Sequence, residues 1–165
     1  MRIPLLILAL LVALVVGTYV ARDLLSGGAA TISPPTARQV AILRLLNVER
    51  AHHGLPPMLY DAELARTARA QSAAMIAGNY FDHRGFERRL ESIHRQERGE
   101  IISWGSPGYR SAAQIVTGWV LSPPHEAIIL TRQFVRAGVG TQITDRLYQG
   151  FRGDVVATVD VSTAR

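Results

Sequence analysis

Two residue types are missing from this chain of 165 residues: it contains no cysteine and no lysine. Without cysteine there is no disulfide, and no thiolate can serve as a nucleophile or a metal ligand. Without lysine there is no amine for Schiff-base chemistry or for a lysine base. The folded part of the protein must therefore be held by packing alone. Any reactive or metal-binding site must use histidine, carboxylate or hydroxyl groups.

Because lysine is absent, all 18 basic residues are arginine, and the formal net charge is +5 with a pI near 10.4. Such a charge permits attraction to anionic lipids, cell-wall polymers or nucleic acid. We interpret the main cluster as a solvated surface, with a specific anion site as the alternative. Its members are Arg84, Arg88, Arg89, Arg95 and Arg98. The sequence has no zinc knuckle, no RNP-type strand and no helix-turn-helix, so no nucleic-acid partner is predicted.

The N-terminal segment is the longest apolar run. Residues 3–20 are almost entirely apolar, with Arg2 in front and with Arg22 and Asp23 behind. The pattern predicts an apolar helix that is either an uncleaved signal-anchor or a cleaved signal peptide, and its length lies between the two. In both cases the segment contacts the membrane. The remainder of the protein is then extracytoplasmic, either anchored or secreted.

Domain organisation follows from these shifts in composition. We assign residues 1–25 to the signal-anchor or signal peptide and residues 26–37 to a linker that is rich in glycine, serine and proline. Residues 38–165 are then one domain, because their number suits a single compact core.

Local signals predict two helices at the start of this domain. Thr36 is a candidate N-cap for a helix that stops at Gly54, and Asp61 is one for a helix that Gly78 closes. Apolar residues recur at helical spacing in both segments. Both helices are therefore expected.

Shorter elements are expected after Gly78. We predict a helical piece within residues 87–94 and a short strand over residues 101–104. Ser111 is a candidate cap for a third helix. Ser122 is a candidate cap for a fourth helix, which Pro123 begins, and its hydroxyl is expected to accept backbone N–H groups.

Three β-rich runs end the chain, over residues 139–143, 147–151 and 155–161. The last two are separated by residues 152–154, which are suited to a hairpin turn. Helices that come first and an antiparallel meander that comes last predict a layered α+β domain.

Several short motifs occur in a fixed order along this domain and carry a family resemblance. They are Leu46-Asn47-x-x-Arg50-x-x-x-Gly54-Leu55-x-Pro57, Asp61-x-x-Leu64, Phe81-Asp82-His83, Gly99-Glu100, Trp119-x-x-Ser122-Pro123-x-His125 and Gly138-Val139-Gly140. Residues 38–160 resemble the CAP superfamily (cysteine-rich secretory proteins, antigen 5 and plant pathogenesis-related proteins; SCP-like) in its short bacterial, cysteine-free form. The resemblance implies a three-layer α-β-α sandwich with a small, mainly antiparallel sheet.

The resemblance also implies a polar cleft. His83, Glu100 and His125 match two histidines and a glutamate that bind a divalent cation such as zinc in some members. In two places the chain departs from the pattern: Ile101 replaces the asparagine that usually follows the glutamate, and Ser122 replaces a second glutamate. Two imidazoles and one carboxylate can bind Zn²⁺ with an open position, or transfer protons. Alternatively, the three side chains bond one another and brace the sheet against the helices.

The other polar candidates have simpler interpretations. Ser122 lies three residues before His125, but there is no Gly-x-Ser-x-Gly elbow, and a helix cap explains the serine better than a hydrolase nucleophile. His52 and His53 lie at the end of a predicted helix, where a cation meets the negative end of the helix dipole. We interpret both, together with His94, as solvated.

Three functions from different classes remain open. The first is an extracytoplasmic binding or interaction domain whose ligand, on the resemblance, is a lipid or a cell-wall component. The second is a metal-dependent hydrolase of peptide or cell-wall substrates, with a water on Zn²⁺ and Glu100 as ligand or base. The third is a structural cell-surface protein. We favour the first, because the polar site is incomplete and no convincing nucleophile is present.

Overall fold

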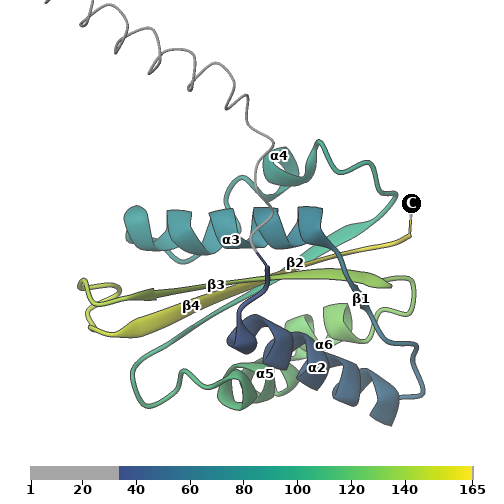
Figure 1. Cartoon of the computed structure of the whole chain (residues 1–165), viewed down its shortest axis with the longest axis horizontal. Helices are drawn as coiled ribbons and strands as arrows, with labels where there is room; N and C mark the ends of the chain where they lie inside the picture. The colour runs from purple at the N-terminus through teal and green to yellow at the C-terminus, as the bar shows by residue number, and fades with distance from the viewer. Residues whose placement is uncertain (1–33, 165) are drawn as a thin grey trace, which may run out of the picture. The chain divides into compact units, whose positions relative to one another are not determined.

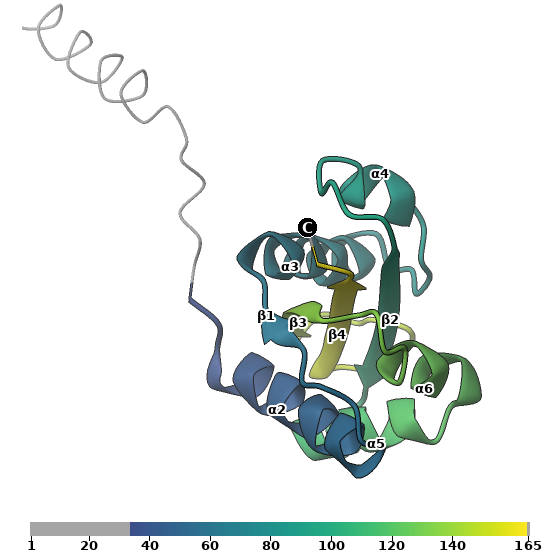
Figure 2. The same ribbon diagram turned by 90° about the vertical axis from the view of Figure 1, so that its right-hand side faces the viewer.

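The computed structural model describes residues 34–164, and in this part of the chain a four-stranded sheet lies between two layers of helices (Figure 1). One layer contains α3 and α4, and the other contains α2, α5 and α6 (Figure 2). In chain order the elements are α2 (Ala37–His52), β1 (Leu59–Tyr60), α3 (Ala62–Ala77), α4 (Phe86–Leu90), β2 (Arg98–Gly105), α5 (Ala112–Val120), α6 (Pro123–Ile129), β3 (Arg136–Thr144) and β4 (Asp154–Ser162). The predicted α+β, three-layer architecture is confirmed.

The sheet is mainly antiparallel, with the strand order β1-β3-β4-β2. Strand β4 is central and pairs antiparallel with β3 and β2, whereas the two-residue β1 pairs parallel with β3. Every residue of β4 is buried, because both of its faces are covered by helices. Strand β2 forms one edge of the sheet, and it carries Glu100.

Helices begin where the capping residues are. Thr36 forms a capping box with Gln39, and Ser111 forms one with Gln114. The Asp61 carboxylate accepts the backbone N–H groups of Glu63 and Leu64. These side chains satisfy backbone donors that have no partner inside the helix, which explains why local signals located the three helices correctly.

Four local predictions need correction. Residues 147–151 are not a strand: Tyr148 and Phe151 form a single bridge within the connection from β3 to β4. The strand predicted over residues 101–104 extends over all of β2, and the helical piece predicted within residues 87–94 is α4. Ser122 does occupy the N-cap position of α6, but its side chain makes no capping hydrogen bond.

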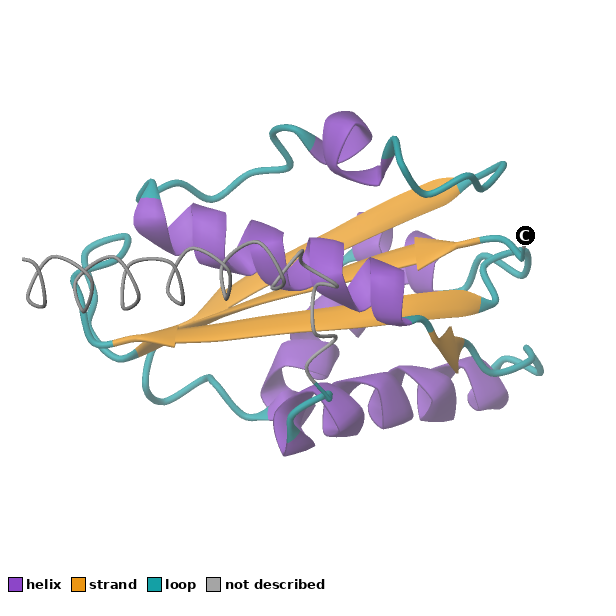
Figure 3. Ribbon diagram, turned by 45° about the horizontal axis from the view of Figure 1, so that its top comes forward, coloured by secondary structure: helices purple, strands orange, loops and turns teal. Residues whose placement is uncertain are grey.

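The main apolar core lies between the sheet and the layer formed by α2, α5 and α6. Its largest fully buried side chain is Trp119, whose indole N–H donates to the backbone oxygen of Ile102 at 2.8 Å. On the opposite face α3 lies directly against β3 (Figure 3). A Cβ at Gly138 or Gly140 would overlap the backbone of α3, so glycine sets the distance between these two layers.

The predicted signal-anchor or signal peptide and most of the predicted linker lie outside the described residues. Residues from Pro34 onward form one compact unit. Within residues 34–164, no helix has the length and apolar character needed to cross a membrane.

Candidate functional site

The candidate site is built around a pair of carboxyl groups on neighbouring strands. Glu100 of β2 and Asp160 of β4 are register partners, and their exposed fractions are 5% and 0%. Both side chains lie on the face of the sheet that α3 covers, since Thr67 of α3 donates its hydroxyl to Asp160 Oδ2 at 2.6 Å. Two carboxyl groups buried this close together require neutralising partners.

Arg89 and His83 supply these partners to Glu100. The Arg89 guanidinium of α4 forms an ion pair with Glu100 Oε2, and His83 Nδ1 lies 2.8 Å from Glu100 Oε1. Both oxygens of the Glu100 carboxylate are therefore engaged. The structure thus brings together two of the three predicted site residues and adds an arginine that sequence reasoning placed on a solvated surface.

The loop that carries His83 is held at its base. Gln71 of α3 donates its side-chain amide to the backbone oxygen of Asp82 at 2.8 Å. The Asp82 carboxylate in turn pairs with Arg84, and this ion pair lowers the pKa of Asp82 below its usual range. These contacts fix the loop while leaving the His83 side chain half exposed.

Most of the arginine cluster has a structural role. Besides Arg89, Arg95 pairs with Asp61 at 2.8 Å, and Arg98 pairs with Glu87 at 3.1 Å and donates to the backbone oxygen of Leu90. The interpretation as a solvated surface therefore needs correction for these residues. They attach the α4 region to α3 and β2.

Asp160 carries its proton more readily than an ordinary carboxyl group. Burial raises the pKa of Asp160 well above its usual range, and the negative charge of Glu100 raises it further. A protonated Asp160 leaves a single negative charge at this point, which Arg89 balances. One signal in the sequence pointed to this residue: an acidic side chain inside the apolar run of β4 needs a buried partner.

His125 approaches the site from the opposite layer, in the first turn of α6. Burial lowers the pKa of His125, and the positive charge of His83 lowers it further. Its Nδ1 atom is buried without a hydrogen-bond partner among the described residues. His125 is therefore a neutral imidazole close enough to His83 to sense its charge.

The predicted metal trio does not fit a closed metal centre in this structure. Both Glu100 oxygens are engaged by His83 and Arg89. Among the described residues, the one group of three or more His, Asp or Glu side chains whose ligand atoms all lie within 4.8 Å is Glu49, His53 and Glu126. Metal binding by His83, Glu100 and His125 stays a prediction.

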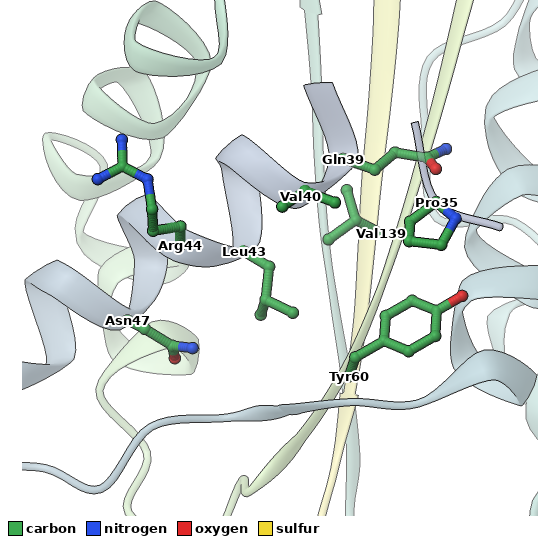
Figure 4. A pocket seen from close by; sticks show the side chains of 8 residues that line it. All are labelled: Pro35, Gln39, Val40, Leu43, Arg44, Asn47, Tyr60 and Val139. Carbon is green, nitrogen blue, oxygen red and sulfur yellow. The ribbon is translucent and has the colours of Figure 1, made fainter. Parts of the chain in front are cut away.

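An apolar hollow of about 360 Å³ lies elsewhere, between the first half of α2 and the edge of the sheet at β1 and β3. Val40, Leu43, Tyr60 and Val139 face one another across it (Figure 4). A second hollow, of about 230 Å³, lies between α2 and α5. Sequence reasoning did not locate either one, and the structure shows that Val40, which lines the first, is exposed.

This fold and these motifs define a secretory-type α-β-α domain, and comparison with known proteins assigns it. Residues 43–159 match the CAP family, described as the cysteine-rich secretory protein family, and the chain belongs to that family.

Two bacterial relatives have similar sequences. The Bacillus subtilis protein YkwD is 32% identical over 115 residues, which is 66% of this chain and 44% of YkwD. The Bacillus subtilis membrane protein YlbC is 33% identical over 120 residues, which is 68% of this chain and 33% of YlbC. The chain thus spans less than half the length of these relatives.

Solved structures show the same fold. An extracellular protein containing an SCP domain from Bacillus anthracis superposes with a TM-score of 0.64 at 24% identity, over 80% of this chain and 45% of that protein. An outer surface protein from Borrelia burgdorferi superposes with a TM-score of 0.65 at 15% identity, over 80% of this chain and 97% of that protein. At sequence identities of 24% and 15%, the similarity establishes a shared fold and nothing beyond it.

Proposed function

We propose that this protein is a binding module that works outside the cytoplasm, and that His83, Glu100 and His125 form its polar recognition site. The observation that carries the proposal is the engagement of Glu100, whose two oxygens bind His83 and Arg89. A carboxylate paired with a guanidinium is a poor general base and has no free oxygen for a metal. The cluster therefore suits holding a ligand better than carrying out hydrolysis.

The His83 imidazole is the part of this site that a ligand can reach. Its side chain is 50% exposed, and its Nδ1 is directed to Glu100, which leaves Nε2 without a hydrogen-bond partner among the described residues. The opposite nitrogen of a fixed imidazole is a well-oriented hydrogen-bonding group. Amide and hydroxyl groups of cell-wall fragments have the chemistry to meet it.

Titration of the full-length protein in detergent micelles with soluble peptidoglycan fragments tests the proposal. We expect binding that weakens about tenfold in His83→Ala, because one good hydrogen bond to a histidine contributes about 1.4 kcal/mol. His94→Ala, which removes another exposed histidine, is the matched control and should bind like the wild type. Equal binding by His83→Ala and the wild type would contradict the proposal.

The same preparation separates binding from catalysis. Turnover of peptides or peptidoglycan fragments that disappears in His125→Ala would replace the binding proposal with the hydrolase alternative. We expect no such turnover, with or without added Zn²⁺, because no carboxylate at the site is free to act as a base.

The apolar hollow at α2 favours a second candidate function, the binding of a lipid-like ligand. Its volume of about 360 Å³ lies within the range of small-molecule pockets, and apolar side chains such as Val40, Leu43 and Val139 line it together with the polar Gln39, Arg44 and Asn47. The hydroxyl of Tyr60 makes no hydrogen bond within the described residues and lies at the border of the hollow (Figure 4). A ligand with an apolar chain and one polar group matches this lining.

Displacement of a fluorescent fatty-acid analogue from the full-length protein tests this second function. Val40→Trp fills the hollow between α2 and β1 and should abolish binding. Val48→Trp places the same side chain on the same helix but in the hollow between α2 and α5, so it serves as the matched control. Loss of binding in Val48→Trp alone would move the ligand to that second hollow.

A further inference from the structure

A second cluster of histidine and carboxylate groups lies away from His83 and Glu100, where the C-terminal end of α2 meets α6. Glu49 and His53 are one helical turn apart on α2, and Glu126 lies in the first turn of α6, 77 positions further along the chain than Glu49. One imidazole nitrogen and two carboxylate oxygens of these residues lie within 4.8 Å of one another. We infer that Glu49, His53 and Glu126 form a zinc site that joins α2 to α6.

Two of the three ligand atoms are already at ligand spacing. Glu49 Oε1 lies 3.1 Å from His53 Nε2. Bonds of about 2.0–2.2 Å from Zn²⁺ to nitrogen and oxygen place neighbouring ligand atoms about 3–4 Å apart. The carboxylate of Glu126 lies within 4.8 Å of both ligand atoms and is only partly buried, so binding a metal ion requires that it move closer to them.

The charges at this point call for a cation. The Glu126 carboxylate makes no hydrogen bond or ion pair among the described residues, although a second carboxylate, that of Glu49, lies within 4.8 Å. Glu49 is already paired with His53 at 3.1 Å and with His52 at 3.7 Å, whereas the neighbouring Arg50 donates its hydrogen bonds to the backbone oxygens of Pro56, Ile129 and Thr131 and none to either carboxylate. The C-terminal end of α2 adds the negative end of a helix dipole.

The donor set selects the class of cation. Ca²⁺ and Mg²⁺ take oxygen ligands, whereas an imidazole nitrogen beside carboxylates suits zinc and the neighbouring transition metals. Three protein ligands leave at least one position for water, and His53 and Glu49 are reachable from solvent. The two histidines at the end of α2, interpreted from the sequence as solvated, therefore differ: His53 is a ligand, and His52 is its neighbour.

A cation here would also affect the polar recognition site mechanically. Glu126 and His125 are adjacent in α6: His125 lies close enough to His83 to sense its charge, and Glu126 lies close to Glu49 and His53 of the α2 end. Fixing Glu126 to α2 would hold the helix that carries His125. The inference does not depend on the proposed binding function, because no ligand atom is shared between the two sites.

Zinc titration of the full-length protein in detergent micelles, with metal content measured after equilibrium dialysis, tests the inference. We expect one equivalent of Zn²⁺ per chain that is lost in His53→Ala and Glu126→Gln, with affinity reduced about tenfold or more, since even indirect partners of a ligand contribute that much. A hundredfold excess of Zn²⁺ over its Kd should raise the wild-type Tm by roughly 5–10 °C.

His94→Ala is the matched control, because it removes an exposed imidazole that contacts none of the three proposed ligands. His83→Ala is the second control, and both variants should keep the zinc equivalent and the rise in Tm. The inference is overturned if the wild type retains no zinc, or if His53→Ala and Glu126→Gln retain as much as the wild type. Tm values without zinc show that the variants fold. A loss of zinc confined to His83→Ala would assign the metal to the other site and also overturn the inference.

Discussion

Glu100 and Asp160 are directly opposite one another across the β2–β4 ladder, and both carboxyl groups are buried. Only one of the two has cationic partners, because Arg89 and His83 both bind Glu100. Asp160 instead accepts a hydrogen bond from Thr67 and has its pKa raised by burial. The two carboxyl groups therefore differ: Glu100 is paired with cationic groups, whereas burial favours the protonated form of Asp160, and the raised pKa of Asp160 makes stability depend on pH.

Asp160→Asn should stabilise the protein at pH 7–8, because the pKa of Asp160 is raised by burial and asparagine cannot ionise in this buried position. A carboxyl group whose pKa is raised by folding contributes stability below its unfolded pKa of about 3.9, and that stability is lost as pH rises through the folded value. Asparagine resembles the protonated acid and removes this loss. Urea unfolding between pH 4 and pH 8 should show a shallower pH dependence in the variant.

The exposed Asp145 provides the matched control for this change. Asp145→Asn should leave the pH dependence of unfolding as in the wild type. A variant Asp160→Asn that is less stable than the wild type at every pH would contradict the assignment, since it would show that the ionised form of Asp160 is the one bound.

Arg89→Met should destabilise the fold by about 3 kcal/mol, because it leaves the buried Glu100 carboxylate with His83 as its remaining partner. Methionine keeps most of the volume, so the loss reports the charge more than the packing. Urea unfolding followed by circular dichroism measures it. Arg88→Met, on the exposed side of the same short helix, should change stability by less than about 0.5 kcal/mol. Equal effects of the two substitutions would show that the ion pair between Arg89 and Glu100 does not stabilise the fold.

Gly138→Ala should cost about 3 kcal/mol or more, or prevent folding, because the added Cβ overlaps the backbone at Leu64 and Ala65. Backbone atoms of a packed helix cannot move aside as a flexible side chain can. The same change at Gly118, in α5, meets no atom within 4 Å and should stabilise that helix by about 1 kcal/mol. Thermal unfolding of the two variants compares them directly. A tolerated Gly138→Ala would mean that α3 is free to move away from the sheet.

Ser122→Ala should change the free energy of unfolding by less than about 0.5 kcal/mol, because the Ser122 side chain caps no backbone group of α6. Ser111→Ala, at the corresponding position of α5, removes a capping box and should cost about 1 kcal/mol. Urea unfolding of both variants tests the difference. A larger loss for Ser122→Ala than for Ser111→Ala would restore the capping role that the sequence predicts for Ser122.

The errors in the strand predictions have a common physical cause. Residues 147–151 are rich in residues that favour strands, but Leu147 and Phe151 are exposed, and only Tyr148 is buried between them. A local preference for the strand conformation does not show that a neighbouring strand is available to pair with the segment. For the same reason, the two residues of β1 have no sequence signal: they are a strand only because β3 lies beside them.

The residues of the candidate site were likewise only partly predictable from the sequence. His83, Glu100 and His125 were singled out by the order of motifs along the chain, and the structure places His83 on Glu100. Arg89 and Asp160 were not singled out as site residues, although Arg89 pairs with Glu100 and Asp160 lies opposite it in the sheet. Arg89 lies on α4, 11 positions before its partner Glu100. Thr67 lies on α3, 93 positions before its partner Asp160. Spacing along the chain carries no information about contacts that distant elements create.

Local chemistry was enough to locate the helices, because Thr36, Asp61 and Ser111 act on backbone groups within three residues of themselves. The order of short motifs was enough to indicate the family. The tertiary structure decided which carboxyl group has a cationic partner, which arginines are structural, and that Glu49, His53 and Glu126 meet between two helices. Those outcomes depend on burial and on distances of a few ångströms between distant residues, and both come into existence only when the layers pack.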